Sequence, residues 1–154
     1  MIQEKELLVR QALNEVKDPE IPTLSIVELG MVYSVEAGEE EVRVRLMPTF
    51  VGCPALDIIR RDVENKVQSA TGIPVKVEYV LDEPWTTERI TPEGREHLAS
   101  FGIAPPMAEW WEKPPCPFCG APETEVENLF GPTACRAIYY CTRCRQPFEG
   151  FKPV

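Results

Sequence analysis

Two closely spaced pairs of cysteines near the carboxyl end constrain this chain more than any other feature of its sequence. Cys116 and Cys119 are separated by two residues, 21 residues follow, and Cys141 and Cys144 repeat the same spacing. Each pair predicts a tight turn that directs two thiolates at one point, and two such turns complete a tetrahedral zinc site of the ribbon type. Two disulfides, or a rubredoxin-like iron site, are the alternatives that the spacing leaves open.

The cysteine-rich segment, residues 116–154, is expected to depend on its metal for folding. It holds few apolar side chains, and its predicted strands at 123–130, 134–140 and 148–152 are short. A core this small rarely supports folding without a metal or another crosslink. Four thiolates leave no open coordination position, so the predicted Zn²⁺ is structural and not catalytic.

The first part of the chain predicts a small two-layer α/β domain over residues 1–82. Apolar residues recur at helical spacing over 2–17 and 54–70, whereas alternation at 41–46 and 75–79 predicts strands. A further strand at 31–36 is expected to form a hairpin with the strand at 41–46. The predicted fold class is therefore α/β (α+β), with the order α-β-β-α-β, followed by a connector at 83–115 and the zinc-ribbon module. The connector is rich in proline and contains one short predicted helix that begins at Thr91-Pro92.

The net charge of the chain limits the classes of partner that it is expected to bind. Among 154 residues, 16 are Lys or Arg and 25 are Asp or Glu, so the formal net charge is 16 − 25 = −9. Nucleic acids and anionic membranes need clustered cations, so we expect neither as a partner. No apolar run reaches the roughly 18 residues of a membrane span, and the acidic start does not resemble a signal peptide. We therefore expect a cytoplasmic protein whose cysteines serve metal or thiol chemistry.

A fifth cysteine, Cys53, lies where a predicted strand ends and the clearest predicted helix begins. The surrounding sequence is Thr49-Phe-Val-Gly52-Cys53-Pro54. The positive end of a helix dipole and its free N–H groups favour a thiolate, and Gly52 allows a ligand or a partner backbone to approach closely. From the residues alone, Cys53 is either a metal ligand or nucleophile, or a buried small residue that caps the helix.

Three other residues are candidates of the same kind. Cys135 is either a core-facing thiol of a ribbon strand or a second exposed thiolate that works with Cys53. Asp18 and Glu20 either bind a metal or act as acid/base groups, or they cap helices and solvate turns. The chain has a single histidine and shows no phosphate loop, no Ser/His/Asp set and no dinucleotide fingerprint. The sequence therefore offers no recognisable enzyme site.

These motifs resemble a known family over nearly the whole chain. The first domain resembles the metal–sulfur cluster assembly family that includes the SufT and PaaD proteins. The motifs that carry this likeness are Asp18-Pro-Glu20-Ile-Pro22, Leu29-Gly-Met-Val32, Thr49 and Gly52-Cys53-Pro-Ala55. The later segments resemble the PaaD group of that family, through Pro84-Trp-Thr-Thr87, Gly102-Ile-Ala-Pro-Pro106, Phe130-Gly-Pro-Thr-Ala-Cys135, Tyr140-Cys141, Cys144, Pro147-Phe148 and Phe151-Lys152.

The resemblance implies an accessory subunit of a phenylacetyl-CoA 1,2-epoxidase, a multicomponent ring monooxygenase, and not an enzyme by itself. The resemblance further implies that such chains help to mature an iron–sulfur or other metal centre of the catalytic or reductase subunits. The family's motif thiol corresponds to Cys53, its acidic motif to Asp18 and Glu20, and a tail cysteine to Cys135. The implied site holds a transient iron–sulfur cluster, shared with Cys135, with a second chain in a homodimer, or with a client protein. The alternative is an adaptor that docks epoxidase subunits through the zinc ribbon and holds no cluster.

Overall fold

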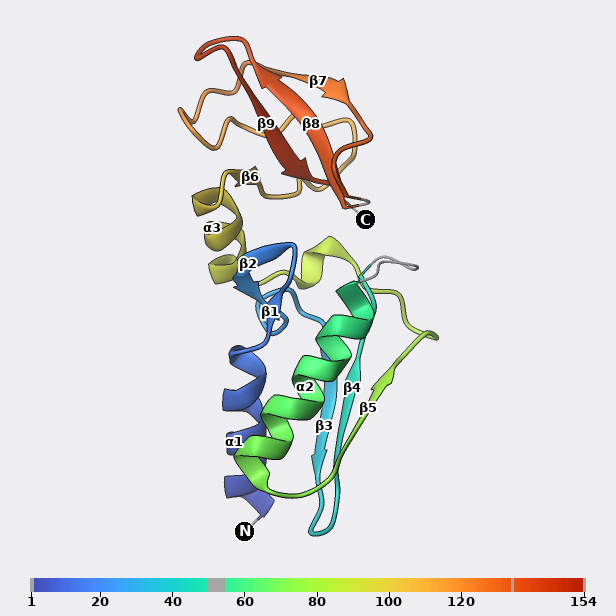
Figure 1. Cartoon of the computed structure of the whole chain (residues 1–154). Coiled ribbons are helices and arrows are strands. Elements are labelled where there is room, and N and C mark those ends of the chain that lie inside the picture. Colours follow the sequence, from blue (N-terminus) through green and yellow to red (C-terminus); the bar gives the residue numbers. More distant parts are fainter. Residues whose placement is uncertain (1, 50–54, 134, 154) are drawn as a thin grey trace. The chain divides into compact units, whose positions relative to one another are not determined.

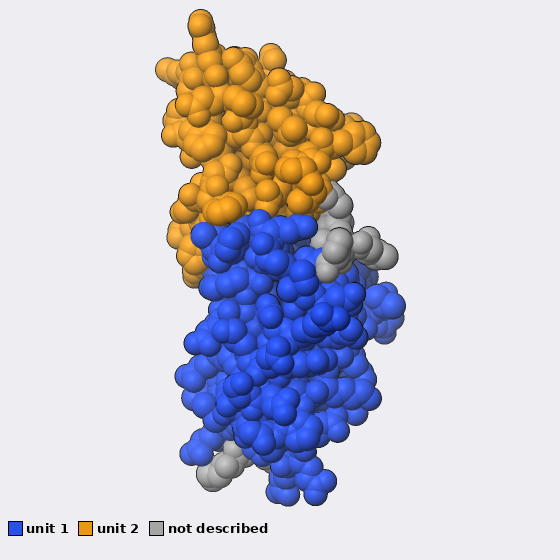
Figure 2. Space-filling view, viewed as in Figure 1, with its two compact units in different colours: residues 1–85 blue, residues 86–154 orange. Residues whose placement is uncertain are grey.

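The computed structural model describes residues 2–49, 55–133 and 135–153. The chain divides into two compact units, residues 1–85 and residues 86–154 (Figure 2). In the described residues no helix is both long enough and apolar enough to span a membrane. The predicted division into a domain at 1–82, a connector at 83–115 and a ribbon at 116–154 stays a prediction.

The first unit is built on a three-stranded sheet in the order β3-β4-β5. β3 (Val32–Ala37) and β4 (Val42–Leu46) form the predicted hairpin, and β5 (Val75–Tyr79) pairs with β4 in parallel. Because parallel neighbours need a crossover connection, the helix α2 (Ala55–Thr71) joins β4 to β5. The predicted order of these elements is confirmed.

Two helices cover one face of this sheet. The helix α1 (Ile2–Asn14) lies beside α2, and both pack against the sheet (Figure 1). The alternation of β4 directs one set of side chains into the helices and leaves two arginines between them on the other face. The core side chains from both layers are fully buried: Val9, Leu13, Val42, Val44, Leu46, Ile59, Val63 and Val67.

The end of α1 differs from the sequence expectation. The helix ends at Asn14 and not at residue 17, because Lys17 and Asp18 form a short strand, β1. β1 pairs antiparallel with β2 (Ile21–Ser25) in a small separate hairpin. Two-residue strands leave no periodic signal, and the two prolines in this segment favour turns, so the pairing was not predicted.

The second unit begins with a helical segment. It contains the short 3₁₀ helix η1 (Thr87–Arg89) and the helix α3 (Pro92–Ser100), which matches the predicted connector helix. The hydroxyl of Thr91 accepts a hydrogen bond from the Gly94 N–H at 3.0 Å and thus caps α3.

The rest of the second unit is a four-stranded sheet in the order β6-β9-β8-β7. Its strands are β6 (Ile103–Ala104), β7 (Thr124–Asn128), β8 (Arg136–Cys141) and β9 (Gln146–Phe151). β8 pairs antiparallel with both β7 and β9, while the short β6 pairs in parallel with β9. The ribbon strands therefore lie close to their predicted positions.

Candidate metal centre

The ribbon sheet positions two cysteine turns. Cys116 and Cys119 lie in a turn that precedes β7, and the Cys116 N–H donates to the Ala121 carbonyl at 3.0 Å. Gly120 follows this turn with a φ of +78°, a backbone conformation that glycine adopts at least cost. Cys141 ends β8, and Cys144 lies in the turn that leads to β9. Cys141 faces Gln146 in the strand register, so this hairpin closes beside the second pair of sulfurs.

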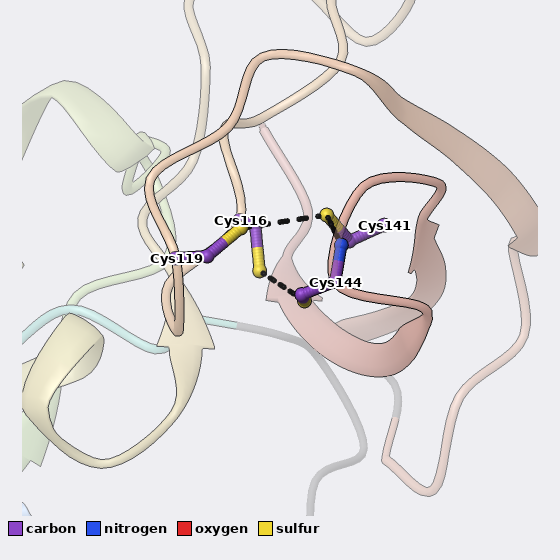
Figure 3. A group of neighbouring side chains, drawn as sticks. All are labelled: Cys116, Cys119, Cys141 and Cys144. Atoms are coloured by element: carbon purple, nitrogen blue, oxygen red, sulfur yellow. Dashed lines mark hydrogen bonds between the residues drawn. The ribbon is translucent and has the colours of Figure 1, made fainter.

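The four sulfur atoms converge as the spacing predicted. All four Sγ atoms lie within 4.8 Å of one another (Figure 3). Two pairs join the two turns: Cys116 Sγ lies 3.7 Å from Cys144 Sγ, and Cys119 Sγ lies 3.6 Å from Cys141 Sγ. A tetrahedral ion with metal–sulfur bonds of about 2.3 Å requires sulfur atoms about 3.8 Å apart. The donor set and its spacing therefore fit one zinc-sized ion with four thiolate ligands.

Backbone N–H groups support the thiolates from within each turn. The Phe118 N–H donates to Cys116 Sγ at 3.4 Å, and the Cys144 N–H donates to Cys141 Sγ at 3.5 Å. The Cys144 N–H is the main cause that lowers the pKa of the Cys141 thiol to about 7. Burial, together with hydrogen bonds from the other sulfurs, raises the pKa of Cys144 to about 12. A metal that binds at neutral pH must therefore displace a proton from Cys144.

The four sulfur atoms of the candidate site are unequally accessible. Cys116 and Cys141 are buried in the ribbon core, whereas Cys144 is half-buried and Cys119 is exposed. The ring of Tyr139 stacks on that of Phe148 with a centroid distance of 5.5 Å, beside the buried cysteines in the same core. This core is small and consists otherwise of alanines: Ala104, Ala121 and Ala137. Its stability must therefore depend heavily on the four-sulfur site.

Cys135 is not part of this centre. It immediately precedes β8, whereas Cys141 ends that strand, and six residues of extended strand span about 20 Å. Its Sγ lies 3.1 Å from the Thr133 hydroxyl, and its carbonyl accepts the Lys152 N–H at 2.9 Å. Cys135 is half-buried, and its role as a core-facing thiol or as a second thiolate that works with Cys53 stays a prediction.

In the acidic motif of the first unit, Asp18 and Glu20 are joined by a hydrogen bond that stabilises a turn. A carboxylate oxygen of Asp18 accepts the Glu20 N–H at 2.8 Å, which closes the turn between β1 and β2. Thr49 is half-buried in the bend after β4. Gly52 and Cys53 lie outside the described residues, so their predicted role stays a prediction.

The first unit contains a reciprocal pair of hydrogen bonds that the sequence analysis did not predict. The Ser25 N–H donates to a Glu28 carboxylate oxygen and the Glu28 N–H donates to the Ser25 hydroxyl, each at 3.1 Å. The spacing of Ser25 and Glu28 is that of a capping box, a signal that could have found it. The pair orders the turn that leads to Met31, whose carbonyl accepts the Met47 N–H at 2.7 Å.

Comparison with known proteins defines the class first. The model of the family "Iron-sulfur cluster assembly protein" matches residues 8–78, and that of the "PaaD zinc beta ribbon domain" matches residues 109–152. A crystal structure of a domain of unknown function, DUF59, from Bacillus anthracis is similar to this chain, with a TM-score of 0.58 and 29% identity over 62% of this chain and 92% of that one. The chain thus combines an iron–sulfur assembly-type α/β domain with a four-cysteine zinc ribbon.

Relatives then identify the family. The chain is 39% identical over 147 residues to a putative 1,2-phenylacetyl-CoA epoxidase subunit of Escherichia coli strain K12, covering 92% of this chain and 89% of that protein. It is 36% identical over 99 residues to an Fe-S protein maturation auxiliary factor of Porphyromonas gingivalis, covering 63% of this chain and 92% of that protein. The chain belongs to the PaaD family, and the resemblance drawn from its motifs is confirmed.

Proposed function

We propose that this chain is an accessory protein of a phenylacetyl-CoA 1,2-epoxidase system, in which it assists the maturation of an iron–sulfur or other metal centre. The observation that carries the proposal is the 39% identity to the Escherichia coli epoxidase protein across 92% of the chain. The likeness of a shorter segment to an Fe–S maturation factor supports the second part of the proposal. The chain itself performs no catalysis and acts in the cytoplasm on the catalytic or reductase subunits.

The four-cysteine centre serves this function as a structural Zn²⁺ site. Cys116, Cys119, Cys141 and Cys144 supply four ligands, which leave no coordination position for a substrate. When bound, the ion closes the two turns onto each other and thereby stabilises the ribbon. The ribbon is then a rigid surface with which the chain recognises its client protein.

Cys53 is the residue that handles the cargo. Iron–sulfur clusters need thiolate ligands. A protein that passes a cluster on must hold it loosely enough to release it, and a site of few ligands suits this task. One thiolate per chain meets that need if Cys135, a second chain in a homodimer, or the client provides the others. Asp18 and Glu20 support the site indirectly, since the Asp18 carboxylate orders the turn that contains Glu20.

The test compares Cys53→Ser with Cys135→Ser in cells that lack their own copy of the gene. We expect Cys53→Ser to abolish epoxidase activity and to remove labile iron and sulfide from the protein after anaerobic cluster reconstitution, while one zinc per chain and the melting temperature stay unchanged. The Cys135→Ser variant decides whether that thiol supplies a second ligand, since only then does it lose labile iron as well. Full epoxidase activity with Cys53→Ser would refute the maturation role and favour the adaptor, which predicts stable co-purification with epoxidase subunits.

A further inference from the structure

Two of the sulfur–sulfur distances in the metal centre join the two turns. Cys119 and Cys141 are 3.6 Å apart, and Cys116 and Cys144 are 3.7 Å apart (Figure 3). A disulfide joins its sulfurs at about 2.05 Å, so the sulfurs of each of these pairs would have to approach by about 1.6 Å. Each cysteine of one turn therefore has a neighbouring thiol in the other turn.

The two pairs are unequally accessible to small molecules. Cys119 is the exposed member of the four, and an open pocket of about 450 Å³ lies over it. The pocket is lined by Cys119, Gly120, Ala121, Pro122, Arg143 and Cys144. Cys116 and Cys141 are only 2% and 0% exposed, so an oxidant meets Cys119 first.

We propose that the two cysteine turns can be crosslinked in two alternative ways. In one, four thiolates bind one zinc ion; in the other, two cross-turn disulfides form when a peroxide oxidises the site and the zinc leaves. The disulfides are Cys119–Cys141, formed first, and Cys116–Cys144. The proposal requires the zinc ribbon but not a cluster at Cys53, so it stands or fails independently of the maturation role.

The chemistry balances with hydrogen peroxide as the oxidant. The Cys119 thiolate attacks one peroxide oxygen, so that an S–O bond forms, the O–O bond breaks and a hydroxide leaves. The Cys141 thiolate then attacks the sulfenic sulfur, so that the S–S bond forms and a second hydroxide leaves. Two electrons pass from the sulfurs to the peroxide, and two protons convert the hydroxides to water. A second peroxide oxidises Cys116 and Cys144 in the same way.

The pairing determines what happens to the fold. Cross-turn disulfides link the segment before β7 to the turn between β8 and β9, as the metal does, so the ribbon keeps its strands after the metal is lost. Disulfides within each turn would leave the two turns unconnected, with only the small cluster around Tyr139 and Phe148 beside the cysteines to hold them together.

The experiment uses the whole chain with Cys53→Ser and Cys135→Ser, which leaves only the four cysteines of the metal centre. Zinc release is followed with a colorimetric chelator during titration with hydrogen peroxide, and the remaining thiols are then alkylated. Trypsin cleaves after Arg136, Arg143 and Arg145 but poorly at Lys113-Pro114, so Cys116 and Cys119 remain on one peptide, 96–136. Cys141 and Cys144 fall on two others, 137–143 and 144–145.

We expect one zinc per chain to be released by two equivalents of peroxide and peptide 96–136 to be linked to both other peptides. Fragmentation between Cys116 and Cys119 should assign Cys119 to Cys141. The oxidised protein should keep its ribbon strands by circular dichroism, whereas protein stripped of zinc under reducing conditions should lose them, and dithiothreitol with zinc should restore the first state.

Three results would overturn the proposal. The first is peptide 96–136 closed on itself with 137–143 linked to 144–145, since this means pairing within each turn. The second is zinc retained against excess peroxide with all four thiols still protected. The third is a protein that contains no zinc even when it is purified from cells grown in zinc-containing medium, since the zinc-crosslinked state would then not exist.

Discussion

Trp85 offers a test of how the first unit is held together, because its indole contributes both burial and a hydrogen bond. The side chain is 3% exposed, and its Nε1–H donates to the carbonyl of the buried Leu29 at 2.8 Å. In Trp85→Phe, the Leu29 carbonyl loses this donor in a dry environment, which costs about 1–3 kcal/mol. The smaller ring leaves a cavity that costs about 1 kcal/mol more.

We therefore expect the free energy of unfolding to fall by about 2–4 kcal/mol. For a unit of this size that lowers the melting temperature by roughly 10–20 °C. The assay is urea and thermal unfolding followed by circular dichroism at 222 nm, where the helices α1 and α2 dominate the signal. The matched control is Trp110→Phe, since Trp110 is 67% exposed and should change stability by less than about 0.5 kcal/mol. Equal effects of the two substitutions would refute the reasoning.

Two further predictions concern the metal and the open face of the first sheet. Removing zinc with a chelator under reducing conditions should abolish amide-exchange protection in β7, β8 and β9 while residues in α2 and β4 keep theirs; continued protection of the ribbon strands would contradict its dependence on the metal. A hydrogen bond from Lys76, together with the charges of Lys76, Arg43 and Arg45, lowers the pKa of the Glu78 carboxyl group. The ionised Glu78 therefore stabilises the fold at neutral pH. This stabilisation is lost as the pH falls through the lowered pKa of Glu78. The Lys76→Met variant should move the Glu78 carboxyl titration, measured by NMR, up toward the ordinary range, and an unchanged titration would contradict the assignment.

Much of the fold could be predicted because its signals are local. The helix α2 follows apolar residues at steps of three and four, and β4 follows strict alternation, so each pattern corresponds to one buried face. The cap of α3 by Thr91 was equally readable, because the hydroxyl and its N–H partner lie three residues apart. The hairpin of β1 and β2 was not readable, because a strand of two residues is defined by its partner and not by its own pattern.

The candidate site was also only partly readable. Two cysteine pairs of fixed spacing predicted a four-sulfur centre, and the structure brings those four residues together. The sequence could not say whether Cys135 joins them, since its distance from Cys141 depends on the intervening residues being extended in β8. Whether Cys53 caps a helix or binds the cluster is decided by the proposed Cys53→Ser experiment.

The sequence by itself determined the family, the four cysteines of the candidate metal centre and the presence of an α/β domain followed by a ribbon. These properties are carried by residue types at fixed short spacings and by charge, which hold in any conformation of the chain. Only the tertiary structure decided that Cys119 comes within 3.6 Å of Cys141, that Cys119 alone of the four is exposed, and that Trp85 reaches the Leu29 carbonyl. The two contacts join residues 22 and 56 positions apart, and such contacts and exposures are set by packing and not by a local sequence pattern.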